Sequence, residues 1–268
     1  MPGPWFGGWA FDAERPWAGF DAERWVLPEV LAWWDGTQAW LAAFGVGQSD
    51  EQLSARLDAV EEGEPSTTPL TFTTVPGDRT AWGALVERAL DTINSGACSK
   101  LVLARVIEAT FEGSERTLLK SLEARHPQCW TFLIRGREGQ AFIGATPETL
   151  LESNADELAI DALAGTDPAG KGVELLQSDK DLREHLAVVH GIRESIAPFV
   201  TRTEIPDAPV IKALANVEHL YTPVRATLKP GVRALDVARA LHPTPAVSGT
   251  PKQISTAWLR QHEGFARG

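Results

Sequence analysis

The chain has 268 residues, of which 43% are hydrophobic and 23% are charged, a composition typical of a globular protein with a large core. It carries 36 Asp and Glu against 25 Lys and Arg, and this acidic balance argues against a nucleic-acid partner, because phosphate binding needs a basic face. No run of residues approaches the roughly 18 apolar positions of a transmembrane helix, and we expect no membrane association and no signal peptide.

The first forty residues are rich in tryptophan and are strand-like in pattern. Residues 4–11 and 23–34 read as strands, and seven of the ten tryptophans lie in this region. An aromatic stripe can form a sugar-binding face, but tryptophan is more often a large core residue, and we expect these side chains in the core.

A short helix and an acidic loop follow. Residues 52–60 have the pattern of a short helix, and the polar residues 61–66 read as an exposed loop. This loop is the best candidate for a boundary between two parts of the chain. We expect one incomplete domain over 1–268, with an N-terminal sheet portion at 1–69 and a core portion at 70–268.

The clearest predicted helix lies between Asp78 and Gly96, just before Lys100. Asp78 is a plausible N-cap and Gly96 a plausible C-terminal stop. A β-rich run at 100–107 follows, so Lys100 lies where a helix gives way to a strand. The helical pattern between the two caps comes from apolar residues spaced by three or four: Trp82, Leu85, Val86, Ala89, Leu90 and Ile93.

Two strand pairs are predicted in the middle of the chain. Residues 130–135 and 141–145 form a hairpin through the turn at 136–140. Residues 150–152 and 157–162 form the second pair, which turns at Ser153 and Asn154.

Helices dominate the rest of the chain. A long helix is predicted at 171–200, and a shorter one at 233–241 runs into a proline-containing loop at 242–245. Strands occur in groups without strict alternation with helices, so the predicted fold is α+β, with large, mostly antiparallel sheets flanked by helices. The buried stripe predicted for the long helix consists of Leu182, Leu186, Val189, Ile192 and Ile196.

Generic motifs of catalysis or metal binding are absent from the sequence. There is no nucleotide-binding loop, zinc-protease helix or nucleophile elbow. His185 and His190 are five residues apart and do not share a helix face. Cys98 and Cys129 have no metal-binding spacing, so we expect two reduced thiols in a cytoplasmic protein.

Four segments nevertheless stand together in a recognisable order. In this order and spacing they closely resemble the chorismate-binding enzymes, which comprise isochorismate, salicylate, anthranilate and aminodeoxychorismate synthases. The resemblance runs from Trp82 to the end of the chain, residues 3–8 also look like a strand of the family's N-terminal half, and it implies the family's fold. The segments are Ser-Lys-Leu-Val-Leu-Ala-Arg at 99–105, Phe-Ile-Gly-Ala-Thr-Pro-Glu at 142–148, Leu-Ala-Gly-Thr at 163–166 with Asp-Lys-Asp-Leu-Arg-Glu-His at 179–185, and Leu-His-Pro-Thr-Pro-Ala-Val-Ser-Gly-Thr-Pro at 241–251.

The resemblance implies a substitution on the ring of chorismate. Water adds at the carbon next to the carboxylate-bearing one, and the 4-hydroxyl group leaves as the double bonds shift. The matching family positions make Lys100 the general base, Glu148 the general acid and Glu184 a ligand of Mg²⁺. Weaker candidates for the substrate pocket are Gly165, Thr166, His219, Ser248 and Gly249.

Physical chemistry agrees with these roles but leaves structural alternatives open. A lysine can be a base near neutral pH only if its pKa is lowered, and a glutamate can be an acid only if its pKa is raised, so we expect opposite shifts for Lys100 and Glu148. Mg²⁺ prefers oxygen ligands such as Glu184. Alternatively, Lys100 is a surface lysine at a strand end, Glu148 a charge in a first helical turn, Glu184 part of a solvated helix face, and His219 a core residue.

Two segments point to water as the nucleophile. Ala164 stands where aminodeoxychorismate synthases have a nucleophilic lysine, and residues 242–249 look like those of isochorismate synthases. The resemblance therefore favours an isochorismate synthase, with a salicylate synthase, which also expels pyruvate, as the nearest alternative. Isochorismate feeds menaquinone or catechol siderophore synthesis. No glutamine amidotransferase partner is expected, because water replaces ammonia.

The sequence also departs from the family pattern. Family members continue past the segment that matches residues 263–265, and the further region supplies a second Mg²⁺-binding glutamate. We therefore expect Glu184 to lack its metal partner in this chain. A non-catalytic fragment, or a remnant that binds a carboxylate ligand, is the second hypothesis.

Overall fold

A computed structural model describes residues 4–34, 37–45, 47–59, 71–74 and 77–268. The chain divides into two compact units, Met1–Thr67 with Arg267–Gly268, and Thr68–Ala266. All strand pairs in the described residues are antiparallel, which confirms the predicted α+β class. The single incomplete domain stays a prediction, and the loop expected at 61–66 lies outside the described residues. Among these residues, no helix has the length and apolar character needed to cross a membrane.

The first unit contains two strand pairs and a helix. β1 pairs with β2, and β3 pairs with β4. The helix begins with a capping box, in which Ser49 and Gln52 each accept a hydrogen bond from the other's backbone N–H. The helix predicted at 52–60 is therefore confirmed, with its start two residues earlier. The elements are β1 (Phe6–Trp9), β2 (Glu23–Val26), β3 (Val30–Trp34), β4 (Ala39–Ala43) and α1 (Asp50–Asp58).

Two predictions for this unit were wrong. The single strand expected at 23–34 is divided into β2 and β3, with Pro28, which cannot donate a hydrogen bond to a neighbouring strand, in the gap. Trp5, Trp33 and Trp40 are 55%, 44% and 46% exposed and are not core residues. Trp33 and Trp40 are opposite each other on β3 and β4 and stack with ring centroids 6.0 Å apart, so they form a cross-strand pair on the surface.

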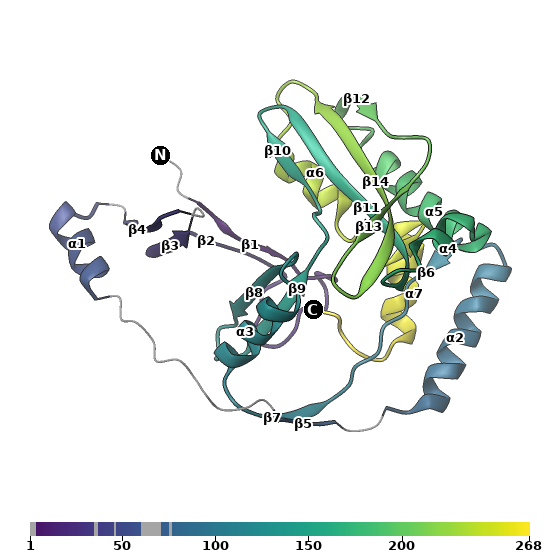
Figure 1. The fold of residues 1–268 in the computed structure, drawn as a ribbon, viewed down its shortest axis with the longest axis horizontal. Helices are drawn as coiled ribbons and strands as arrows, with labels where there is room; N and C mark the ends of the chain where they lie inside the picture. Colours follow the sequence, from purple (N-terminus) through teal and green to yellow (C-terminus); the bar gives the residue numbers. More distant parts are fainter. Residues whose placement is uncertain (1–3, 35–36, 46, 60–70, 75–76) are drawn as a thin grey trace. The chain divides into compact units, whose positions relative to one another are not determined.

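The second unit is built around a five-stranded sheet with strand order β10-β11-β14-β12, in which β13 also pairs with β14. Its elements are β5 (Thr71–Thr74), α2 (Arg79–Asn94), β6 (Lys100–Leu101), β7 (Ala109–Glu112), α3 (Glu115–Arg125), β8 (Trp130–Arg135), β9 (Ala141–Thr146), β10 (Glu152–Asn154), β11 (Glu157–Pro168), α4 (Gly172–Gln177), α5 (Asp179–Ile196), β12 (Val200–Glu204), β13 (Val210–Ala213), β14 (Val217–Leu228), α6 (Ala234–Leu241), β15 (Gly249–Thr250) and α7 (Lys252–His262). Figure 1 shows β11 and β14 side by side, with α5 next to them.

Alternation along β11 and β14 explains the core and positions the site. Ile160 of β11 and Val224 of β14 are buried in one cluster with Val188 and Ile192 of α5. Successive side chains of a strand point to opposite faces, so the residues between the buried ones face away from the helices. Asp161 and Tyr221 are such residues, and both belong to the candidate site described below.

Several local predictions for the second unit are confirmed. α2 begins after Asp78, whose side chain accepts hydrogen bonds from two backbone N–H groups, and it ends just before Gly96, which has φ +79°. The hairpin of β8 and β9 closes with a hydrogen bond from the N–H of Gly136 to the carbonyl of Gln140. The predicted helix at 233–241 is α6.

The long helix predicted at 171–200 is wrong in its continuity. It is divided into α4 and α5 at Ser178, which is extended and accepts a hydrogen bond from the N–H of Asp181 as the N-cap of α5. The buried stripe also differs, because Leu186 is 55% exposed while His185 and Val188 are buried.

Two strand boundaries also differ from the prediction. The run at 100–107 forms a strand only at β6, because its partner β15 is equally short. The pair at 150–162 turns at Ala155 and Asp156 rather than at 153–154, since Asn154 pairs with Glu157 and Ala155 has φ 54°.

Candidate active site

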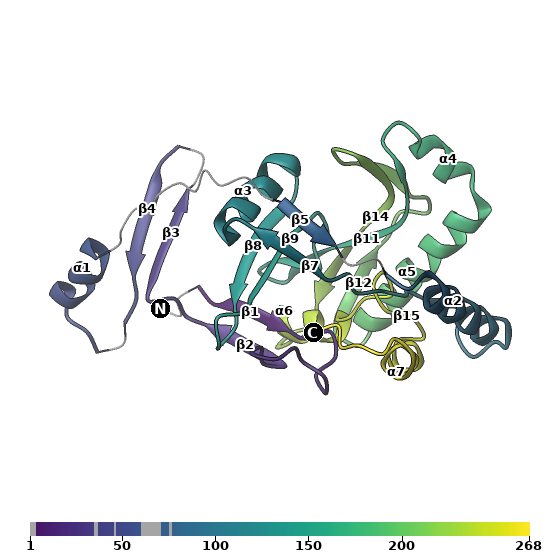
Figure 2. The ribbon, with the colours of Figure 1, turned by 90° about the horizontal axis from the view of Figure 1, so that it is seen from below.

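Lys100 is buried at a tightly fixed backbone position. It opens β6 and lies opposite Thr250 of β15, which is adjacent to α7 (Figure 2). The N–H groups of Ser99 and Val102, on either side of β6, donate to carbonyls of the β15 segment. Its own carbonyl accepts a hydrogen bond from the hydroxyl of Ser255 at 3.3 Å. The side chain of Lys100 is only 9% exposed, so the structural alternative, in which Lys100 is a surface lysine, is wrong.

The charged end of Lys100 meets a carboxylate of α5. Its Nζ lies 3.2 Å from Oε1 of Glu184, whose side chain is 36% exposed. The exposed Lys180, one turn earlier on the helix, has its Nζ 4.0 Å from the other carboxylate oxygen. The structure thus joins the predicted base to the predicted metal ligand through an ion pair that is buried on the lysine side.

Ser248 and Gly249 form the backbone support of Lys100. Gly249 has φ +143°, and a Cβ built on it would lie 2.2 Å from the carbonyl oxygen of Lys100. Only glycine therefore allows β15 to approach β6 this closely. Ser248 is fully buried and its hydroxyl donates to the carbonyl of Thr244 at 2.9 Å. Through these contacts, both residues hold the segment that leads into β15 in place.

Glu148 lies in a short turn after β9, and its own backbone N–H donates to the hydroxyl of Thr146 at 3.3 Å. Burial raises the pKa of the Glu148 carboxyl to about 7, and the negative charge of Asp161 adds to this increase, while Lys212 and Lys100 lower the pKa. The predicted direction for Glu148 is confirmed. The opposite shift expected for Lys100 stays a prediction.

Three residues that sequence reasoning missed surround this turn. Lys212 of β13 has its Nζ 3.0 Å from Oδ2 of Asp161, and the hydroxyl of Tyr221 donates to Oδ1 of the same carboxylate at 3.0 Å. Lys212 also donates to the carbonyl of Pro147 at 3.3 Å. The available signal was a single polar residue inside an apolar strand segment, such as the aspartate between Ile160 and Ala162.

Gly165, Thr166 and His219 are brought together by a bulge. The register of β11 on β14 shifts between Ala164 and Thr166, where Gly165 has φ +75°. Nδ1 of His219 lies 2.9 Å from the hydroxyl of Thr166 and 3.3 Å from the carbonyl of Gly165. Gly165 and Thr166, two of the five predicted pocket residues, therefore both lie within hydrogen-bond distance of a third, His219.

His185, next to Glu184 on α5, is buried beneath the site. Its Nε2 lies 2.7 Å from the hydroxyl of Thr222. Burial lowers the pKa of His185 to about 4, and the charge of Lys100 contributes in the same direction. The nearby carbonyl of Ala164 opposes this shift in pKa, although it falls short of hydrogen-bond geometry with Nδ1. A neutral ring follows at pH 7.

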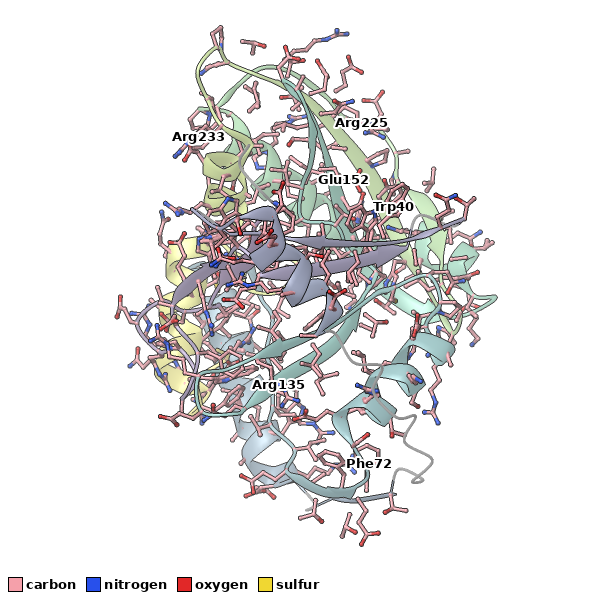
Figure 3. The ribbon with its side chains drawn as sticks, turned by 90° about the vertical axis from the view of Figure 1, so that its left-hand side faces the viewer. Trp40, Phe72, Arg135, Glu152, Arg225 and Arg233 are labelled. Carbon is pink, nitrogen blue, oxygen red and sulfur yellow. The ribbon has the colours of Figure 1, made fainter. Side chains whose placement is uncertain are left out.

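A cavity of about 160 Å³ borders the cluster of Asp161, Lys212 and Tyr221. Asp161 and Tyr221 line it, together with Glu152 and Arg225, which Figure 3 labels. Lys100, Glu148 and Glu184 are not among its lining residues. The cavity therefore adjoins the residues around Glu148 and does not itself contain the proposed reacting groups.

The described residues do not form a complete metal site. Among them, no group of three or more His, Cys, Asp or Glu side chains is arranged to hold a metal ion. Glu184 is one partly exposed carboxylate beside two ammonium groups. Mg²⁺ often uses one or two protein carboxylates and completes its shell with waters and substrate oxygens. A single partly exposed carboxylate such as Glu184 is compatible with a site of this kind.

Comparison with known proteins gives consistent matches. A family model described as "Chorismate binding enzyme" matches residues 3–268. The salicylate biosynthesis isochorismate synthase of Pseudomonas aeruginosa is 40% identical over 200 residues, which cover 71% of this chain and 42% of that protein. The isochorismate synthase MenF of Bacillus subtilis is 30% identical over 257 residues, covering 91% and 51%. The chain thus spans about half the length of these curated relatives.

The solved structures show the same fold. The menaquinone-specific isochorismate synthase MenF of Escherichia coli superimposes with a TM-score of 0.78 over 98% of this chain and 64% of that one, at 24% identity. At this level of identity the likeness supports the fold alone.

Proposed function

We propose that this chain, which belongs to the chorismate-binding enzyme family, binds chorismate and has the chemistry of an isochorismate synthase. The observation that carries the proposal is the pairing of an acid with a potential base. Glu148 has a pKa of about 7 and is close enough to Lys100 for the lysine charge to lower that pKa. A carboxyl group with this pKa is about half protonated at pH 7, so a substantial fraction of the molecules can donate a proton to a leaving group.

The proposed reaction needs one proton removed and one supplied. Lys100, once deprotonated, takes a proton from a water molecule, whose oxygen bonds to the ring carbon beside the carboxylate-bearing one. The double bonds shift, the bond from the ring to the 4-hydroxyl oxygen breaks, and Glu148 gives its proton to that oxygen. One water is consumed and one is released, so the overall change is an isomerisation of chorismate to isochorismate.

Mg²⁺ is part of the proposal, with Glu184 as its ligand from this chain. The cation would neutralise the substrate carboxylate when it is bound. The partial exposure of the Glu184 carboxylate supports this role, and the cation would compete there with the ammonium group of Lys100. In the proposed complex, a cation on Glu184 would hold the carboxylate end of the substrate near the proposed base.

The direct test is proton NMR of chorismate incubated with this chain and Mg²⁺. Isochorismate as the product supports the proposal. Formation of salicylate and pyruvate would show that the chain is a salicylate synthase instead. Unchanged chorismate, under conditions where the protein is folded, would mean that this chain does not carry out the reaction.

A further inference from the structure

We propose that Asp161 and Lys212 are positioning residues for Glu148, which hold the turn that carries it against the central sheet and fix the charges that its carboxyl group faces. The inference rests on the proposed function only in treating Glu148 as the acid. The two residues lie on β11 and β13, and Tyr221 of β14 joins them.

The turn is anchored on both sides of Glu148. The side chain of Lys212 donates to the carbonyl of Pro147 at 3.3 Å, one residue before Glu148. The backbone N–H of Asp161 donates to the carbonyl of Thr149 at 3.3 Å, one residue after it. Glu148 is therefore placed by contacts with both of its chain neighbours, and both contacts come from residues of one ion pair.

The ion pair itself is held in one geometry. Both carboxylate oxygens of Asp161 are engaged, Oδ2 by Lys212 at 3.0 Å and Oδ1 by the hydroxyl of Tyr221 at 3.0 Å. The Nζ of Lys212 also lies 5.0 Å from the centre of the Tyr221 ring, within the range of a cation–π contact. The side chains of Asp161 and Lys212 are only 17% and 29% exposed, so solvent screens their charges less than it screens surface charges.

Glu148 faces three charges from the surrounding elements. The negative charge of Asp161 raises its pKa, and the positive charges of Lys212 and Lys100 lower it. Removing either member of the Asp161–Lys212 pair leaves the other unbalanced. The two removals should therefore move the pKa of Glu148 in opposite directions.

The test is a pH titration of the Glu148 carboxyl in the full chain, followed by ¹³C NMR after labelling of glutamate side-chain carboxyls. The Glu148→Gln variant assigns the signal. We expect Asp161→Asn to lower the pKa of Glu148 and Lys212→Met to raise it, each by about one pH unit. If Asp161→Asn does not fold, Lys212→Met alone decides the question, because a loosened turn would lower the pKa that the inference expects to rise. If Lys212→Met does not fold, Lys212→Gln, which also removes the charge, takes its place.

The matched control is Glu152→Gln, which also removes one negative charge beside the same cavity. The charge of Glu152 acts on Tyr221 but is not among the charges that shift Glu148, so this variant should leave the titration in place. If both residues only supported the fold, either substitution would loosen the turn and lower the pKa by hydrating Glu148. Shifts in the same direction, or no shift, would overturn the inference.

This measurement does not depend on turnover. Opposite shifts without conversion of chorismate would support the positioning role and count against the proposed function. Conversion of chorismate, with a Glu148 titration that neither variant changes, would support the proposed function and overturn the positioning role.

Discussion

The ammonium nitrogen of Lys100 lies 3.2 Å from Oε1 of Glu184, so the proposed base and the proposed metal ligand are in contact before substrate arrives. An ammonium group has no lone pair with which to accept a proton. Lys100 must therefore lose a proton before it can act on water. A cation that binds Glu184 would weaken the attraction that holds the two side chains together.

Replacement of Lys100 by alanine should lower the rate of chorismate conversion by about 10²–10⁴-fold, the usual contribution of a general base. The rate is measured by NMR at saturating Mg²⁺. Lys120→Ala, which removes an exposed lysine of α3, is the matched control and should keep its rate. A Lys100→Ala variant within a few-fold of the original rate would show that another group is the base.

Replacement of Glu148 by glutamine should change how stability depends on pH. The pKa of Glu148 rises from 4.5 to about 7 in the folded chain, so the folded state retains a proton that the unfolded state has lost between these values. The stability from this group is present below pH 4.5 and is lost as the pH rises through 7. The total loss is on the order of 3 kcal/mol.

The Glu148→Gln variant lacks this titration. Its free energy of unfolding, relative to that of the original chain, should increase between pH 4.5 and pH 8. Urea unfolding of both proteins at the two pH values gives the comparison, in which groups common to both cancel. A constant difference would mean that Glu148 has an ordinary pKa.

Replacement of Gly249 by alanine should disturb the support of Lys100. The new Cβ would lie 2.2 Å from the carbonyl oxygen of Lys100, at a φ of +143°, and such strain costs about 2 kcal/mol or more. Gly83→Ala is the control, because a Cβ there meets nothing within 4 Å inside α2. It should stabilise the chain by about 0.5–1 kcal/mol. Equal melting temperatures for the two variants would contradict the account.

Mg²⁺ should bind weakly to the chain alone and about tenfold more tightly with chorismate present, because the substrate completes the site. Calorimetric titration of the Glu148→Gln variant, in which chorismate is not consumed, measures this coupling. Glu184→Gln in the same background should abolish it, while Glu194→Gln, an exposed change on the same helix, should not. Tight Mg²⁺ binding without chorismate would point to a preformed site.

Local signals in the sequence predict a good part of the fold. Asp78 and the glycine-rich turn at 136–140 indicate α2 and the β8–β9 hairpin, because capping and turn formation depend on neighbouring residues alone. The break at Ser178 also had a local signal, an N-cap serine followed by acidic residues, which a continuous apolar pattern concealed. The length of β6 had none, since it is set by β15, about 150 residues further along the chain.

The candidate site shows the same contrast between features that the sequence indicates and features that depend on long-range pairing. The resemblance to a known family points to Lys100, Glu148 and Glu184, and the structure brings Lys100 to Glu184. Asp161 and Lys212 lie on separate strands and meet only through the register of β13 and β11 on β14. That register depends on long-range pairing, so the sequence showed each residue only as an isolated polar position.

The measurement that tests the central claim most directly is the conversion of chorismate by this chain in water enriched with ¹⁸O, followed by mass spectrometry. The account predicts isochorismate in which the hydroxyl oxygen on the ring carries the label, because solvent water is the nucleophile and the original 4-hydroxyl group is released. Lys100→Ala should form neither labelled nor unlabelled product at a comparable rate. Isochorismate without ¹⁸O, or no conversion by the folded chain, would contradict the account.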